Sequence, residues 1–425
     1  MTKRNNKTGS ILSYLVALIP AVLWIVGHPS SGDFVSLQTS LDGIAKLLGI
    51  AGASLFAWNL ILSARIGWLE KQFGGLDKLY KIHHIIGGLA FIAMLFHPLV
   101  LSIKYATLSL ISAYNFILPS LNDLGLLAGK LVLGGMVVVL FITFYIYVSH
   151  ERFVWIHRLT GVLYVVAVYH FLFVAQSDVR QIPFLFGYLG ALSAIAVGLF
   201  GYRYFAKSLK PRCRYELTYI NSLGDAWEIV LKPLRQGLTH TAGQFAFVSF
   251  PGTQVQPQVH PFSISSAEGA TELRFVIKNL GDYTSTLGGL KQGDVAFIEG
   301  PYGGFSYRNT PAQKQIWVAG GIGITPFLSM ARTIVGSDST AEVHMFYSVA
   351  DRSEAYFADE LAKLASSSQQ KLTFHLHDSS KSGFLTADII AAQVKSLDGY
   401  AVLLCGPGGM MRAMRQQFVA HGVDN

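Results

Sequence analysis

Two apolar stretches, each carrying histidines at two depths, decide the fold. Residues 80–98 read YKIHHIIGGLAFIAMLFHP, and residues 151–172 read ERFVWIHRLTGVLYVVAVYHFL. Each is long enough to cross roughly 30 Å of hydrocarbon, which takes about 20 helical residues. Histidine is costly in hydrocarbon and normally marks a functional position there. The sequence therefore predicts two membrane helices that share a function.

The spacing of the histidines predicts two levels of imidazoles. His83 and His97 lie 14 residues apart, and His157 and His170 lie 13 apart. At about 1.5 Å per residue, the levels are about 20 Å apart. Parallel helices with this spacing can hold two haems, each iron taking one imidazole from each helix. The alternative interpretation of the four histidines is that they make polar contacts within a helical bundle. A haem with two axial histidines transfers electrons and does not bind dioxygen at the metal. Thirteen residues do not return to the same helical face, so the second helix needs a bend or twist.

Composition places a membrane domain in the first half of the chain. Of the 425 residues, 51% are hydrophobic and 14% are charged, and the mean hydropathy is +0.41. Soluble domains have about a quarter of their residues charged. The apolar runs lie within residues 1–210, whereas residues 211–425 have an ordinary soluble composition. Six segments are predicted to span the membrane: approximately 10–27, 44–63, 82–103, 125–148, 153–175 and 183–205.

The basic residues predict the orientation. A net charge of +8 could suggest nucleic acid, but the basic residues gather at alternate ends of the apolar segments. An excess of Lys and Arg marks cytoplasmic loops. We therefore expect a multi-pass protein of the cell membrane, in contact with lipid and not nucleic acid, with both termini in the cytoplasm. The residues on that side are Lys3, Arg4, Lys7, Arg65, Lys71, Lys78, Lys81, Arg152, Arg203, Lys207, Lys210, Arg212 and Arg214.

The second half has two patterns. Short alternating strands between residues 211 and 310 predict a small antiparallel β-barrel. After residue 311, strands alternate with helices, which predicts a parallel sheet of the nucleotide-binding kind. Gly320, Gly321 and Gly323 follow a strand directly and precede a helix that begins near Pro326. Glycines in this position let the backbone approach a diphosphate at a helix N-terminus.

A further motif lies in the predicted barrel. His260, Pro261, Phe262 and Ser263 follow a barrel strand in the sequence QVHPFSISS. A histidine, an aromatic ring and a hydroxyl in one extended segment can line a flavin ring and its ribityl chain. The alternative for this segment is an ordinary turn between strands.

Taken together, these motifs resemble the NADPH oxidase and ferric reductase superfamily, and prokaryotic NADPH oxidases most closely. The resemblance covers about residues 10–420 and is carried by the paired histidines, HPFSIS, VIKNLGDYT, GPYGGF, GGIGITPF and LLCGPGGM. It implies a six-helix transmembrane bundle followed by a ferredoxin-NADP-reductase-like module. The implied domains are a ferric-reductase-like dihaem domain (1–210), an FAD-binding β-barrel (211–310) and an NAD(P)H-binding α/β domain (311–425).

The resemblance also implies roles for individual residues. His83 and His157 would ligate an inner b-type haem, and His97 and His170 an outer one. The flavin ring would be held by HPFS, with Ser263 near its reactive nitrogen, and Cys405 would lie near the nicotinamide. Residues near the FAD diphosphate would be Lys278, Gly281, Asp282, Tyr283 and Thr284. Residues around the nicotinamide nucleotide would be Gly320, Gly321, Gly323, Thr325, Pro326, Ser348, Arg352, Cys405, Gly406 and Pro407.

The implied activity is an NAD(P)H oxidase that passes electrons through FAD and two haems to dioxygen, giving superoxide. The same relay would serve a ferric or cupric chelate reductase. A third reading is a haem-free membrane anchor bearing a flavoreductase. Family members usually carry a basic residue soon after the FYS strand, for the 2′-phosphate of NADPH; here Ala350 occupies the expected position, and Arg352 can substitute. Either NADPH or NADH is therefore an expected donor, and no obligatory protein partner is expected.

Overall fold

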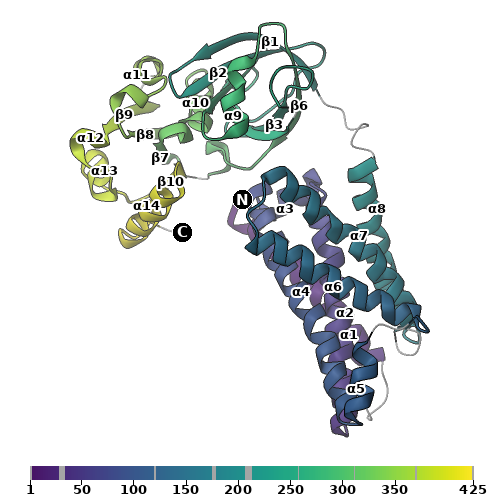
Figure 1. Cartoon of the computed structure of the whole chain (residues 1–425). Coiled ribbons are helices and arrows are strands. Elements are labelled where there is room, and N and C mark those ends of the chain that lie inside the picture. The colour runs from purple at the N-terminus through teal and green to yellow at the C-terminus, as the bar shows by residue number, and fades with distance from the viewer. Residues whose placement is uncertain are drawn as a thin grey trace. The chain divides into compact units, whose positions relative to one another are not determined.

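A computed structural model describes residues 2–27, 34–118, 121–174, 179–205, 213–256, 258–310, 312–368 and 371–423. The chain forms two compact units, a helical one over Lys3–Lys210 and a mixed one over Pro211–Asn425 with Met1–Thr2 (Figure 1). Each unit is described by itself.

Long helices make up the first unit. They are α1 (Thr2–Gly27), α2 (Leu37–Ser63), α4 (Leu76–Ala106), α6 (Leu124–Tyr145), α7 (His150–Val174) and α8 (Pro183–Phe205). Within the described residues, six helices are long and apolar enough to cross a membrane, which confirms the predicted segments. Two short helices, α3 (Gly67–Phe73) and α5 (Leu110–Ile117), were not predicted, and they lie at opposite ends of the bundle (Figure 1).

Helix α2 is the central packing element of this unit. It begins at a capping box, in which Ser36 and Thr39 satisfy each other's backbone N–H groups. It packs along α4 and α8. Two polar contacts join it to α1: the Ser54 hydroxyl donates to the Val16 carbonyl at 2.8 Å, and the Trp58 indole donates to Ser13 at 3.1 Å. Since unpaired polar groups are costly in hydrocarbon, these bonds help to set the α1–α2 register.

A six-stranded antiparallel sheet follows, in the order β4-β3-β6-β1-β2-β5. A bridge between Ile264 and Phe275, with Ser265 N–H bonded to the Arg274 carbonyl at 2.8 Å, joins the two ends of the sheet. The sheet is thus a near-closed barrel, as predicted. One detail differs: HPFS does not follow a strand but is itself strand β4. The strands are β1 (Cys213–Ser222), β2 (Ala226–Pro233), β3 (Phe245–Ser249), β4 (His260–Ser263), β5 (Leu273–Lys278) and β6 (Val295–Tyr302).

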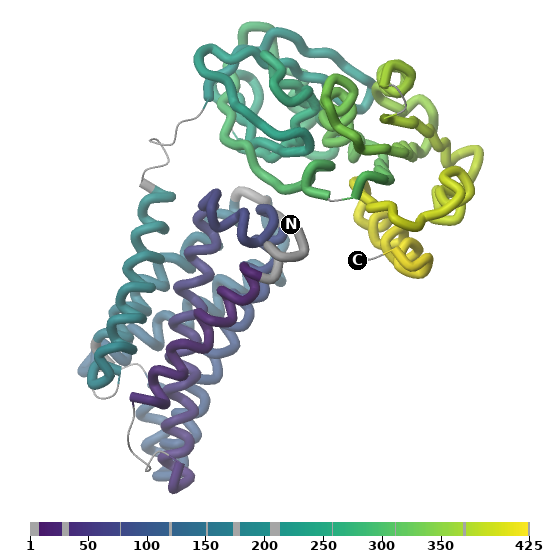
Figure 2. The backbone as a smooth tube through the Cα atoms, turned by 180° about the vertical axis from the view of Figure 1, so that it is seen from behind, coloured from purple at the N-terminus to yellow at the C-terminus, as the bar shows by residue number. Residues whose placement is uncertain are grey.

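The last four strands form a parallel sheet, ordered β10-β7-β8-β9. They belong to the green-to-yellow part of the tube in Figure 2. These strands are β7 (Lys314–Gly320), β8 (Glu342–Val349), β9 (Leu372–Asp378) and β10 (Tyr400–Cys405). The α-helices among and after these strands are α10 (Ile324–Ile334), α11 (Ala358–Ser367), α12 (Ser379–Ser382), α13 (Ala387–Val394) and α14 (Gly408–Ala420). A further short helix, α9 (Asp282–Ser285), precedes β6 in the barrel. Strand order reverses beside β7, and such switch points form the ligand crevice in open α/β sheets.

Candidate functional site

Helices α4 and α7 bring His83 and His157 together. Their ring centres lie 6.2 Å apart with an interplanar angle of 76°. Two metal–nitrogen bonds of about 2 Å, with roughly 1 Å from each nitrogen to its ring centre, give about 6 Å. Nδ1 of His83 lies 3.1 Å from the Asn59 carbonyl, whereas Nδ1 of His157 is buried and has no hydrogen-bond partner among the described residues. The spacing of the two rings suits one metal shared between them.

The second pair is oriented by backbone carbonyls. Nδ1 of His97 lies 2.7 Å from the Ala45 carbonyl, and Nδ1 of His170 lies 2.6 Å from the Gly125 carbonyl. A neutral imidazole that donates from Nδ1 keeps the lone pair of Nε2 free. Metal-ligating histidines almost always donate their other ring N–H in this way. Both imidazoles are therefore held as metal ligands would be.

A cavity of about 810 Å³ lies between these two histidines and is lined by both. Its walls come mainly from α2, α4, α6 and α7. Two glycines make room for the rings. A Cβ atom on Gly49 would lie 3.0 Å from Nδ1 of His97, and one on Gly129 would lie 2.6 Å from Cε1 of His170. The cavity is of the size that takes a cofactor, within the range of about 300–1,000 Å³ for ligand pockets.

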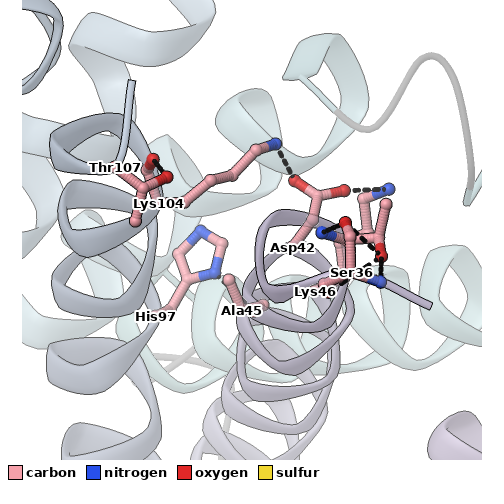
Figure 3. Close-up of polar contacts among 8 residues, drawn as sticks. Ser36, Asp42, Ala45, Lys46, His97, Lys104 and Thr107 are labelled. Atoms are coloured by element: carbon pink, nitrogen blue, oxygen red, sulfur yellow. Dashed lines mark hydrogen bonds and ion pairs between the residues drawn. The ribbon is translucent and has the colours of Figure 1, made fainter. Parts of the chain in front are cut away.

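The sequence singled out the four histidines but not the backbone carbonyls that His83, His97 and His170 contact. The carbonyls of Asn59, Ala45 and Gly125 carry no sequence signal, because every residue has a carbonyl. A charged cluster at the His97 cavity (Figure 3) was also missed, because Asp42 and Lys104 lie just outside the predicted segments 44–63 and 82–103.

Strand β4 and the short helix α9 form an aromatic surface in the barrel. The rings of His260 and Tyr283 lie 4.0 Å apart at 30°, and those of Phe262 and Tyr283 lie 6.4 Å apart at 19°. The Tyr283 hydroxyl is buried and has no partner among the described residues, and burial raises its pKa. An aromatic surface with an unsatisfied donor beside it fits a flat polar ring such as a flavin. Pro261 and Ser263 lie on the same strand.

The turn before α9 is internally satisfied. The Thr284 hydroxyl accepts from the N–H of Gly281 at 3.0 Å and from that of Leu280 at 2.9 Å. Asp282 opens the four-residue helix. The FAD-diphosphate role of Gly281, Asp282, Tyr283 and Thr284 stays a prediction.

Lys278 joins the barrel to the α/β domain. Its ammonium lies 2.8 Å from the carboxylate of Asp225 and 3.4 Å from that of Glu354, and Tyr356 bonds to the same Asp225. These hydrogen bonds, that with Asp225 first, raise the pKa of Lys278. The structure thus places Lys278 between two carboxylates, beside the loop that follows β8.

A Lys278→Gln variant tests whether Lys278 acts through its ion pairs with Asp225 and Glu354 or through the predicted binding of the FAD diphosphate. We expect FAD content per chain to stay within twofold of the parent, because the ammonium is already paired. Stability should fall by up to about 1 kcal/mol, the usual contribution of half-exposed ion pairs. The KM for the nucleotide should rise, since the loop after β8 loses a tether. Chromatographic FAD quantification, denaturant unfolding and steady-state kinetics measure the three effects, and complete loss of FAD would contradict the expectation.

The carboxyl ends of β7 and β10 meet at the switch point. A Cβ atom on Gly323 would lie 2.3 Å from the Cys405 carbonyl oxygen, and one on Gly406 would lie 3.0 Å from the Gly320 Cα. Pro407 packs against Gly320 as well. The glycines are required by this close approach of two loops, in addition to any approach of a ligand. The structure therefore brings the two predicted nucleotide motifs together.

The remaining predicted nucleotide residues lie at the same edge of the sheet. Gly321 takes a positive φ of 51° just before α10, whose first turn contains Pro326. The Thr325 hydroxyl donates to the Ile322 carbonyl at 3.1 Å. Ser348 lies 3.3 Å from Ser379, hydroxyl to hydroxyl, near the carboxyl end of β8. Arg352 lines a small pocket of about 220 Å³ with Ala355, Phe357, Ala358 and Asp359.

Burial raises the pKa of the Cys405 thiol to about 11. At neutral pH the thiol is therefore protonated and a poor nucleophile, because the thiolate is the reactive form.

The low reactivity of Cys405 can be measured in a Cys213→Ser background, which leaves Cys405 as the single cysteine. Iodoacetamide labelling at pH 7.5 should be at least tenfold slower than for free cysteine. The rate should rise about tenfold per pH unit up to pH 10. Fast labelling at pH 7.5 would exclude a buried neutral thiol.

Comparison with protein families gives three matches along the chain. Residues 48–168 match the family "Ferric reductase like transmembrane component", residues 217–306 an "FAD-binding domain" and residues 317–416 an "Oxidoreductase NAD-binding domain". The fold and these matches define a membrane protein with the FAD- and NAD(P)H-binding module of an oxidoreductase. In this order, the three domains are the architecture of NADPH oxidases and ferric reductase-like proteins.

Individual relatives match about half of the chain. The reductase component of propane 2-monooxygenase from Mycolicibacterium smegmatis is 25% identical over 205 residues, 44% of this chain and 58% of that protein. The NADH oxidoreductase HCR of Escherichia coli is 27% identical over 207 residues, covering 47% and 61%. The cytochrome P450 reductase GcoB from Amycolatopsis superposes with a TM-score of 0.44 at 21% identity, over 50% of this chain and 66% of that one. The chain thus spans about half to two thirds of the length of these relatives.

Proposed function

We propose that this protein transfers electrons from NAD(P)H, through FAD and two b-type haems, to an acceptor on the far side of the membrane. The observation that carries the proposal is the pairing of the histidines on α4 and α7. His83 and His157 face each other at metal-sharing distance, and His97 and His170 share a cavity. Bis-histidine ligation fits electron transfer rather than oxygen binding at the iron.

In this proposal the helical half of the chain binds the haems, and the second half binds the flavin and the nucleotide. The surface of His260, Phe262 and Tyr283 holds the flavin, which converts a two-electron donor into single electrons. The loops at Gly320 and Cys405 hold the nucleotide. The boundaries between the three domains lie near residues 210 and 310.

The chain leaves the helical unit at the His83 level, because Arg158, one residue after His157, packs over Tyr204 near the end of α8 at 5.2 Å. The His83–His157 pair is therefore the inner one.

The proposed orientation has both termini in the cytoplasm, as the basic residues favour. Electrons then move outward, from the His83 level to the His97 level. In a cell with a negative interior this direction is favourable by about 2.3 kcal/mol per electron for each 100 mV.

A haem spectrum of the purified full-length protein tests the proposal. Dithionite should give the Soret and α bands of reduced b-type haem, and NADPH or NADH, with FAD present, should reproduce them anaerobically. Reduction by dithionite but by neither nucleotide would break the proposed link between flavin and haem. Absence of haem bands would instead favour the alternative function, a membrane-anchored flavoreductase without haem.

For the acceptor, we propose dioxygen reduced to superoxide, with a ferric or cupric chelate as the second candidate. Both would use the edge of the outer haem. Reduction of an external dye that superoxide dismutase suppresses indicates the oxidase. Reduction of chelated iron that is insensitive to the dismutase indicates the metal reductase.

A further inference from the structure

Helix α10 binds the backbone of the segment that follows strand β4. The Arg332 guanidinium donates through Nη1 to the Ser265 carbonyl at 2.7 Å. The Ser329 hydroxyl donates to the Ser266 carbonyl at 2.6 Å. Residues three apart lie on one face of a helix. One face of α10 therefore holds two successive carbonyls of the barrel.

The remaining bonds of Arg332 go to Glu360 of α11. Nε lies 2.7 Å from one carboxylate oxygen and Nη2 lies 2.8 Å from the other, so the pair is bidentate. The Arg332 side chain is only 11% exposed. Bidentate pairing fixes the direction of the guanidinium as well as its position. One side chain thus joins three segments: α10, the end of β4 and the first turn of α11.

The turn before α11 brings Glu360 to this position. Phe357 immediately precedes α11 and takes a positive φ of 58°. This conformation is unfavourable for a bulky residue, and it persists where the surrounding contacts hold it, often at functional sites. Here the Arg332 guanidinium lies over the Phe357 ring, 5.4 Å from its centre. The strained turn and the ion pair therefore support each other.

Helix α10 connects the two predicted ligand sites of this unit. Its first turn follows the glycine loop that ends at Gly323, and Arg332 lies in its last turn. The helix has 11 residues, which corresponds to about 16 Å. Ser265, at the other end of the Arg332 hydrogen bond, lies shortly after HPFS in β4. A displacement of Arg332 would therefore move the HPFS strand relative to the glycine loop.

Resting on the proposed function, we infer that Arg332 is a positioning residue that sets the distance between the flavin and the nicotinamide. In that step a hydride, which is two electrons and one proton, leaves the nicotinamide and joins the flavin. NAD(P)H becomes NAD(P)⁺, and FAD becomes FADH⁻. The rate depends on the alignment of the two rings, and a misplacement of about 1 Å can cost about a hundredfold. Arg332 acts on this alignment through Ser265 and Glu360.

Anaerobic stopped-flow reduction of the full-length protein by NADH and by NADPH tests this inference, with diode-array spectra that separate flavin from haem bands. In Arg332→Met, the rate constant of flavin reduction at saturating nucleotide should fall by roughly tenfold or more. FAD per chain and the half-saturating nucleotide concentration should stay within about twofold of the parent. The charge-transfer absorbance of dithionite-reduced protein with NAD⁺ should weaken, because it requires stacked rings.

Two further variants give the comparison its scale. Arg332→Lys keeps the charge but loses the bidentate geometry, so an intermediate rate and absorbance are expected. Arg308→Met is the matched control, because Arg308 also pairs with a carboxylate, that of Glu268 at 3.1 Å, but its side chain is 48% exposed. Exposed ion pairs contribute little. This variant should keep the parent rate and absorbance.

Parent-like flavin reduction and charge-transfer absorbance in Arg332→Met overturn the inference. Loss of most FAD in both Arg332→Met and Arg332→Lys also overturns it, because the role is then structural. If Arg332→Met does not fold, its combination with Glu360→Gln, which removes both charges, should show the same slow reduction. Parent protein whose FAD neither nucleotide reduces overturns this inference together with the proposed function. Parent protein whose FAD is reduced while its haem is not overturns the proposed relay alone.

Discussion

Replacing His97 with alanine should halve the haem content, from two haems per chain to one. The imidazole lines the 810 Å³ cavity opposite His170, and a single axial histidine is not expected to retain the group. The remaining haem, between His83 and His157, should still be reduced by NAD(P)H, because it lies before the lost one in the proposed path. Transfer to the external acceptor should fall by at least a hundredfold. Pyridine haemochrome quantification and the acceptor assay measure the two effects.

His84→Ala is the matched control for this series. His84 is on the same helix, next to His83, and its ring lies beside that of Phe144, with ring centres 6.0 Å apart. This variant should keep both haems. The reciprocal variant, His83→Ala, should retain the outer haem but lose its reduction by NAD(P)H. Full haem content in both His83→Ala and His97→Ala would show that these side chains are not the ligands.

The second large effect is expected at Gly129. A methyl group there would lie 2.6 Å from Cε1 and 2.7 Å from Nδ1 of His170, so the imidazole must move away from the Gly125 carbonyl. Loss of the hydrogen bond that orients a metal ligand typically costs about 10–100-fold in affinity. Gly129→Ala should therefore lose most of one haem while the protein still folds, since alanine favours helix over glycine by about 1 kcal/mol.

Gly134→Ala, on the same helix, is the control. A Cβ atom there meets nothing within 4 Å, so haem content should be unchanged and thermal stability equal or higher. Haem per chain and circular dichroism melting, measured on both variants, check the pair. Equal haem content in Gly129→Ala and Gly134→Ala would contradict the placement of His170.

Much of the fold could be predicted from local sequence. The membrane helices were visible because hydrocarbon imposes length and apolar composition on each one separately. The barrel and the parallel sheet followed from strand periodicity and from the alternation of strands and helices. HPFS was predicted to follow a strand, whereas in the structure Pro261 lies within β4, at the end of the sheet order, where proline is tolerated.

The arrangement around the histidines could not be predicted in the same way. It depends on which residue of α2 or α6 lies opposite each ring, and hydropathy does not encode the register between two apolar helices. Gly49 and Gly129 acquire their role only when His97 and His170 lie against them. On an ideal straight helix, the 13-residue spacing of His157 and His170 would not place both side chains on the same face. In the structure α7 is a continuous helix from which His157 faces His83 and His170 lines the cavity with His97.

The most direct test of the whole account is the number of haems per chain in the full-length protein, purified in detergent and supplied with haem during expression. Iron and protoporphyrin, each measured against protein by amino-acid analysis, should both approach two. A value near zero in folded, FAD-binding protein would contradict the proposed electron path at its centre.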